Sequence, residues 1–227
     1  MDLIQLDKQL LLQLCGSDSL FLDSLITTFT KATTWIPLYL ALFYVVLKNS
    51  DNVRNVLLIL ASAGLCVLLA GTVDDSIVKP LVARWRPGRD PEIGMLVDTV
   101  GYYRGGDYGF FSAHASNTFS IAIFFSLLIR SRGLSLTMVL WSLLNCWTRI
   151  YLGVHYPGDI LVGLAWGAIV GTVVYLLYRK FQPQPAQPVN YVSTHYTSTG
   201  YQTSHVDVVI TVLVFTLIYA IVKACVF

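Results

Sequence analysis

Several stretches of apolar residues, each long enough or nearly long enough to cross a lipid bilayer, constrain this chain more than any other feature. About 20 apolar residues in a helix span the hydrocarbon core, so 227 residues hold about five to seven crossings. The expected crossings are residues 34–47, with an extension back toward residue 20, and residues 56–78, 115–129, 134–151, 157–178 and 208–227. The sequence therefore predicts an all-α fold, an integral membrane helical bundle of about six transmembrane helices.

The composition excludes several classes of protein. Hydrophobic residues make up 55% of the chain and charged residues only 12%, whereas soluble domains contain about 25% charged residues. The formal net charge is +2, which is too small to attract a polyanion. We expect the lipid bilayer as surroundings and no nucleic-acid partner. No pattern in the sequence indicates an oligomeric state.

The order of apolar and polar segments predicts four parts. Residues 1–18 contain leucines at helical spacing with acidic residues between them, which is typical of an amphipathic helix on the membrane surface. Residues 19–180 form the expected membrane core. Residues 181–206 are rich in Pro, Gln, Ser, Thr and Tyr and predict a polar linker. Residues 207–227 form the expected C-terminal transmembrane helix.

Basic residues in the short turns predict how the bundle lies in the membrane. Three of these turns contain six basic residues and only Asp51 among acids: Lys48, Arg54, Arg130, Arg132, Arg179 and Lys180. Short loops rich in Lys and Arg stay in the cytoplasm. The long polar loop after Lys79, the turn around His155 and both termini are therefore expected on the periplasmic or extracytoplasmic side of the inner membrane.

Three polar clusters lie at that outer boundary, where charged groups are costly and rarely idle. They are Lys79-x6-Arg86-Pro87, then Phe111-Ser112-Ala113-His114, then Arg149-x5-His155-x3-Asp159. Three cations offered to one anion match the oxygens of a phosphate group. The second and third clusters also open predicted helices, whose free N–H groups favour an anion. Together they predict a phosphate site.

Two histidines beside such a site suggest a division of labour. One attacks phosphorus, and the other protonates the departing oxygen. Asp159, four residues after His155, is placed to accept a hydrogen bond from the ring N–H of His155 and to stabilise the positive charge that forms on the ring. Because the three cations already supply positive charge, we expect neither a metal ion nor a cofactor.

The ordered clusters resemble the three-part signature of the type 2 phosphatidic-acid-phosphatase superfamily, which vanadium haloperoxidases share. The resemblance implies that His155 is the nucleophile that forms a phosphohistidine, that Asp159 orients it and that His114 is the general acid. It further implies phosphate binding by Lys79, Arg86, Ser112, Ala113 through its backbone N–H, and Arg149. The chain departs from the family pattern at Phe111 and Ala113, which replace Pro and Gly, and at Thr148, which replaces Ser.

These features predict a membrane lipid phosphatase that acts at the outer face of the inner membrane. Residues 85–91 and 103–106 look most like the branch with lipid A 4′-phosphatases. Undecaprenyl-diphosphate and phosphatidylglycerophosphate phosphatases are the alternatives within the family. A haloperoxidase that uses vanadate and a non-enzymatic lipid-binding membrane protein are the alternatives of other classes.

Charged residues around the clusters are expected to play supporting roles. Arg84, Arg89 and Arg104 are interpreted as a solvated rim that can contact a headgroup. Asp75, four residues before Lys79, is expected to pair with it and to steady it.

Overall fold

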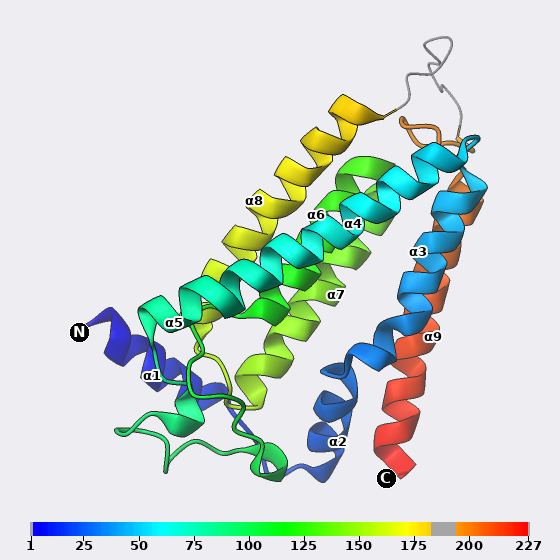
Figure 1. Ribbon diagram of the computed structural model, residues 1–227. Helices are drawn as coiled ribbons and strands as arrows, with labels where there is room; N and C mark the ends of the chain where they lie inside the picture. Colours follow the sequence, from blue (N-terminus) through cyan, green and yellow to red (C-terminus); the bar gives the residue numbers. More distant parts are fainter. Residues whose placement is uncertain (1, 183–193, 227) are drawn as a thin grey trace.

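The computed structural model describes residues 2–182 and 194–226, and these form an all-α membrane protein (Figure 1). Within those ranges no strand occurs, and two isolated bridges join Trp85 to Tyr108 and Tyr196 to Gln202. The α-helices are α1 (Leu3–Leu14), α2 (Leu20–Phe29), α3 (Ile36–Lys48), α4 (Val53–Val73), α5 (Lys79–Val82), α6 (Ala113–Ile129), α7 (Arg132–Tyr151), α8 (Pro157–Phe181) and α9 (Thr203–Val226).

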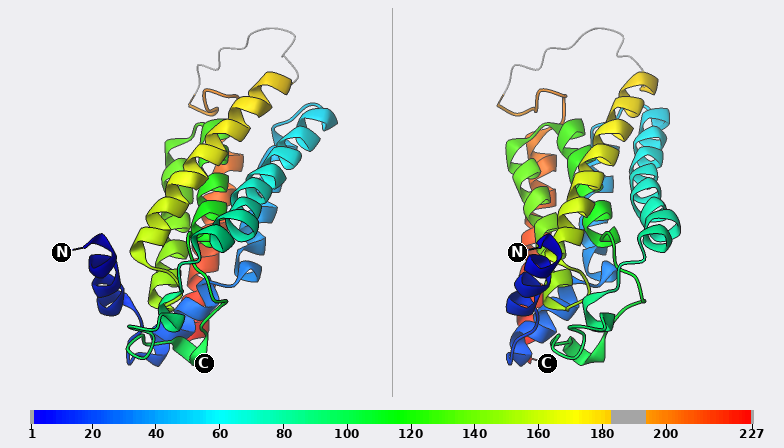
Figure 2. Two further views of the ribbon diagram at one scale, coloured as in Figure 1. Left: turned by 60° about the vertical axis from the view of Figure 1, so that its left-hand side comes forward. Right: turned by 90° about the vertical axis from the view of Figure 1, so that its left-hand side faces the viewer.

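Helix α6 lies at the centre of the bundle and packs against α4, α7 and α8, while α3 and α2 pack against α9 (Figures 1 and 2). The largest buried cluster joins the two groups of helices through aromatic side chains. Trp35, which precedes α3, packs edge-on against Trp141 of α7, and Phe124 of α6 packs against Tyr178 of α8.

Helices α6 and α8 approach each other closely because α8 carries glycine at every fourth position of the contact. These glycines are Gly163, Gly167 and Gly171. A Cβ atom on Gly167 would lie 2.6 Å from the carbonyl oxygen of Ser116, and one on Gly171 would lie 2.5 Å from that of Ser120. The close contact that these glycines allow thus fixes the register of α8 on α6. It also fixes the relative position of the N-termini of the two helices.

Three helical segments are long and apolar enough to cross a membrane: Val53–Val82, Pro157–Phe181 and Thr203–Val226. Residues Leu20–Phe29 and Ala32–Lys48 supply a fourth if this pair, bent by 67°, is one span. Helix α6 is apolar but has only 17 residues. By length and hydropathy, the part of the chain that is described therefore offers three or four crossings, and the expected count of about six is not confirmed.

The bend after α2 has a local cause. The indole of Trp35 donates to the carbonyl of Phe29 at 2.8 Å, and Thr34 donates to the carbonyl of Thr28 at 2.6 Å, so side chains satisfy the end of α2. Pro37 lies in the first turn of α3, where its missing N–H costs nothing. One apolar stretch in the sequence is therefore two helices in the structure.

The short turns that contain basic residues lie at one end of the bundle, and α1, α2, α5 and the C-terminal end of α9 lie toward the other (Figures 1 and 2). Helix α1 lies beside the beginning of α8, with leucines such as Leu3 and Leu14 exposed. Helix α9 begins at Thr203, a few residues before the expected segment. Much of the expected linker, residues 183–193, lies outside the described residues.

Candidate active site

The second and third polar clusters of the sequence meet where α6 and α8 begin. Ser112 caps α6 by accepting the N–H of Ala115, and its own N–H donates to the carbonyl of Asp159 at 3.2 Å. The following N–H groups, those of Ala113 and His114, have no acceptor within the helix. An anion in front of α6 can therefore accept from them, which is the geometry expected of a phosphate site.

His155 and Asp159 are both buried, with exposed fractions of 2% and 0%. Pro157 opens α8, and Asp159 accepts the N–H of Tyr156 at 3.0 Å, so this carboxylate also caps the helix. Its Oδ2 lies 3.6 Å from Nδ1 of His155, slightly beyond hydrogen-bonding distance.

Arg86 determines which nitrogen of the His155 ring carries the proton. Its Nη1 lies 3.3 Å from Nε2 of His155. Because a guanidinium only donates, this contact requires a lone pair on Nε2. The proton of the neutral ring then sits on Nδ1, facing Asp159, and Nε2 keeps the lone pair that a nucleophile requires.

The electrostatic surroundings keep His155 neutral. Burial lowers its pKa well below the ordinary value of 6.5, and the charges of Arg86, Arg149 and Lys79 lower the pKa further. The three cations that the sequence singled out therefore all act on this ring. Burial and the same cations also lower the pKa of His114, so the two histidines and the three cations share one site.

Arg86 and Arg149 are held by different elements of the fold. Arg86 donates to the carbonyls of Tyr108 at 3.1 Å and Val154 at 3.3 Å. Arg149 is 4% exposed, and its Nη1 donates to the hydroxyl of Thr30 at 2.6 Å. Its Nε has no hydrogen-bond acceptor among the described residues, which leaves a donor for a phosphate oxygen.

Lys79 is held by two carboxylates. Its Nζ contacts Asp75, as expected, and also lies 2.8 Å from Oδ2 of Asp74, which is completely buried. Both aspartates belong to a π-helical turn, Asp74–Val78, that joins α4 to α5. Such turns are frequent at functional sites. Four-residue spacing points from Lys79 only to Asp75, so the sequence pattern gives no sign of Asp74.

The interpretation of Arg84 as part of a solvated rim is wrong. Its Nη1 lies 2.7 Å from Oδ1 of Asp159, and its Nη2 lies 2.7 Å from Oδ2 of Asp7 on α1. Residues 84–86 are extended, and alternate residues of an extended segment point the same way. Arg84 and Arg86 therefore both face the site, and this alternation is the signal that could have identified Arg84. Arg89, by contrast, is half exposed, as a rim residue should be.

Comparison with known proteins identifies relatives along most of the chain. A lipid A 4′-phosphatase of Bacteroides thetaiotaomicron is 40% identical over 180 residues, which cover 78% of this chain and 79% of the relative. A lipid A 4′-phosphatase of Porphyromonas gingivalis is 36% identical over 179 residues, covering 78% and 74%. An undecaprenyl-diphosphatase of Bacillus subtilis is 33% identical over 77 residues, covering 34% and 39%.

No solved structure shows a significant match to the chain. The family model for the PAP2 superfamily matches residues 52–183, which is more than half of the chain. All three polar clusters lie within this matched range. The resemblance drawn from those clusters is thereby confirmed, and the chain belongs to the PAP2 superfamily.

Proposed function

We propose that this protein is a lipid phosphatase that hydrolyses the phosphate of a membrane lipid through a phosphohistidine intermediate. The observation that carries the proposal is the 3.3 Å contact between Nη1 of Arg86 and Nε2 of His155, within the field of Arg149 and Lys79. A neutral imidazole surrounded by cations is suited to attack a phosphate, because the cations attract the anion without protonating the nucleophile.

In the first step, Nε2 of His155 forms a bond to phosphorus as the bond to the ester oxygen breaks. His114 gives its proton to that oxygen, which leaves as an alcohol. Asp159 stabilises the His155 ring as it becomes positive. The charge on the remaining phosphate oxygens is stabilised by Lys79, Arg86, Arg149, the Ser112 hydroxyl and the N–H of Ala113.

In the second step, water attacks phosphorus and His114 accepts a proton from it. The bond between phosphorus and Nε2 breaks, inorganic phosphate leaves and His155 returns to its neutral form. These steps use only groups of the chain itself.

The substrate we propose is the 4′-phosphate of lipid A. The two relatives that cover about four-fifths of this chain are both lipid A 4′-phosphatases. Undecaprenyl diphosphate is the second candidate because an undecaprenyl-diphosphatase matches the chain over a shorter stretch. The site is expected on the periplasmic side of the inner membrane, where headgroups reach the ends of α6 and α8 while acyl chains stay in the bilayer.

The test is phosphate release by the purified protein in detergent with EDTA present. Lipid A, undecaprenyl diphosphate and phosphatidylglycerophosphate are supplied separately, and the His155→Ala variant is the control. We expect release from lipid A, with a loss of about 10³-fold or more in the variant. A folded protein that binds these lipids but releases phosphate from none of them would instead indicate a non-enzymatic lipid-binding protein.

A further inference from the structure

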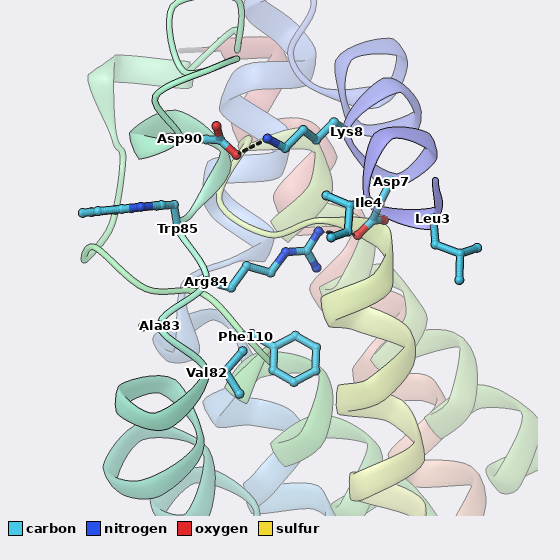
Figure 3. Close-up of a pocket in the computed structure, with 10 residues that line it drawn as sticks. All are labelled: Leu3, Ile4, Asp7, Lys8, Val82, Ala83, Arg84, Trp85, Asp90 and Phe110. Atoms are coloured by element: carbon cyan, nitrogen blue, oxygen red, sulfur yellow. Dashed lines mark hydrogen bonds and ion pairs between the residues drawn. The ribbon is translucent and has the colours of Figure 1, made fainter. Parts of the chain in front are cut away.

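Helix α1 is connected to the predicted catalytic pair by a continuous series of ionic contacts. Figure 3 shows Arg84 reaching from the loop after α5 toward Asp7, and Lys8 reaching toward Asp90. Asp159 is not drawn in this figure. The other terminal nitrogen of Arg84 contacts Asp159, and Asp159 in turn faces His155. The order of contacts is thus α1, Arg84, Asp159 and His155.

Asp7 holds two different parts of the site with its two oxygens. Its Oδ2 accepts from Arg84 at 2.7 Å, and its Oδ1 accepts the N–H of Gly158 at 2.8 Å. A Cβ atom on Gly158 would lie 2.7 Å from Oδ2 of Asp7, so only glycine admits this approach. Because Gly158 directly precedes Asp159, α1 is attached to the helix turn that contains the carboxylate.

The position of Arg84 is fixed on its other sides as well. Its guanidinium lies 4.1 Å from the centre of the Tyr156 ring, within the range of a cation–π contact. The Tyr156 hydroxyl donates to Asp90 at 2.8 Å, and Asp90 pairs with Lys8 at 2.9 Å. The position of the Arg84 guanidinium is therefore set by Asp7 of α1 and by Tyr156, the N-cap residue of α8.

Asp159 depends on this arginine because it is fully buried. A buried carboxylate needs an opposite charge close by. Arg84 is the one Lys or Arg within 4.0 Å of it among the described residues. Arg84 holds Oδ1, while the N–H of Tyr156 holds Oδ2. These two contacts aim the carboxylate at Nδ1 of His155, and loss of the first would let it turn.

We propose that Arg84 is a positioning residue that holds Asp159 against His155, and that α1 acts through Asp7 to hold Arg84. The surface helix is then part of the active enzyme rather than only an anchor. Each terminal nitrogen of Arg84 donates to a carboxylate, so the residue acts through Asp159 and not as a phosphate ligand. The inference rests on the proposed phosphatase activity.

The experiment compares Arg84→Gln, Asp7→Asn and the double variant in phosphate release from the lipid that the wild-type protein hydrolyses. We expect kcat to fall about 10²-fold for Arg84→Gln, since small displacements of catalytic groups have effects of this size. We expect about tenfold for Asp7→Asn. KM should stay within about threefold, and Arg84→Lys should recover part of kcat.

The decisive readout is additivity. Because Asp7 is expected to act through Arg84, the double variant should be no slower than Arg84→Gln alone. Asp2→Asn is the matched control: it makes the same change at the exposed N-cap residue of α1, whose side chain accepts the N–H of Ile4 and does not touch Arg84. Its effect should be small and should multiply with that of Arg84→Gln.

Three results would overturn the inference. They are an unchanged kcat in Arg84→Gln, a raised KM with unchanged kcat, and multiplying losses for Asp7 and Arg84. Thermal unfolding identifies any variant that fails to fold, and the milder Asp7→Asn then decides. If the wild-type protein and His155→Ala release phosphate equally slowly, the proposed function itself fails, and the inference falls with it.

Discussion

At the scale of single residues, the contact between Arg86 and His155 explains why the site is ready to react. The guanidinium needs the lone pair of Nε2, so it selects the tautomer in which the nucleophilic nitrogen is unprotonated. The same positive charge disfavours protonation of the ring. In the proposed mechanism, an incoming phosphate replaces the imidazole as an acceptor for Arg86 and releases the lone pair for attack.

The lowered pKa of His155 sets the acid side of the pH profile. We expect kcat/KM to stay high below pH 6.5, the ordinary pKa of histidine, and to fall only where the buried ring becomes protonated. The alkaline limb should appear where His114 loses its proton. Since burial and the nearby cations also lower the pKa of His114, we expect this limb at a lower pH than an ordinary histidine would give. The measurement is kcat/KM between pH 4 and pH 10, an interval of about six units chosen to include both limbs.

Removing a cation near His155 should shift the acid limb. In Lys79→Gln one positive charge that lowers the pKa of His155 is lost, so that pKa rises and the acid limb moves to higher pH. Arg89→Gln, at a half-exposed residue of the rim, should leave the limb unchanged. An acid limb that stays in place in Lys79→Gln would contradict this account.

Arg149 should not be replaceable by lysine. The guanidinium donates to Thr30 with one nitrogen and keeps Nε for another acceptor, whereas an ammonium group has no planar fork. We expect Arg149→Lys to lower kcat/KM by about 10²-fold with little change in thermal stability. Arg179→Lys, at the opposite end of the bundle, is the control and should have full activity.

The residues of the site were predictable to the extent that their spacing was informative. Helical spacing pointed from Lys79 back to Asp75, but it gave no sign of Asp74, which reaches Lys79 only because a π-helical turn widens the helix there. Arg84 has its partners on α1 and α8, about 75 residues away in each direction. No local pattern encodes such distant contacts.

At the scale of helices, the glycines of α8 control the geometry of the site. Each one lies against a backbone carbonyl of α6, so the two helices cannot slide past each other. A shift by one helical turn, about 5.4 Å, would separate His114 from His155. The two histidines of the proposed mechanism are thus aligned by residues that have no side chain.

Gly167→Ala should destabilise the protein. The new methyl group would lie 2.6 Å from the carbonyl oxygen of Ser116, and such overpacking costs about 1–3 kcal/mol. Gly64→Ala in α4 is the matched control, because nothing lies within 4 Å of its Cβ position. Thermal unfolding in detergent should show a lower Tm for Gly167→Ala only.

The positions of the helices were predictable, and their breaks were not. Hydropathy identified the apolar stretches because burial in lipid requires them, and the predicted start of one stretch at Pro157 is confirmed as the start of α8. The 67° bend between α2 and α3 depends on the hydrogen bond from Trp35 to Phe29, which averaging over a window of residues cannot detect.

At the scale of the whole molecule, the charges divide the bundle into two ends. The predicted cytoplasmic turns lie at the end that α8 reaches at Phe181, and the predicted site lies at the end where α8 begins (Figure 1). Positive charge in short loops sets the orientation of such bundles. We therefore expect the proposed site to face away from the cytoplasm.

This orientation can be tested with cysteines introduced at the two ends. Met95 is 92% exposed in the loop near the site, and Arg132 is exposed at the opposite end. In a background without Cys15, Cys66, Cys146 and Cys225, a maleimide that cannot cross membranes should label Met95→Cys in spheroplasts. It should label Arg132→Cys only after lysis, and the reverse pattern would contradict the proposed orientation.

The match between the glycines of α8 and the carbonyls of α6 also limits how the protein can be re-engineered. A chimera that takes α6 from a relative will place foreign carbonyls against the glycines of α8. We expect it to assemble only when α8 comes from the same donor. The loop between Arg86 and Phe111 contributes little to that helix contact, but its Tyr108 carbonyl accepts from Arg86 and its Asp90 accepts from Tyr156, so an exchanged loop must keep both contacts. We therefore expect a functional chimera to require that α6 and α8 be transplanted as one matched pair.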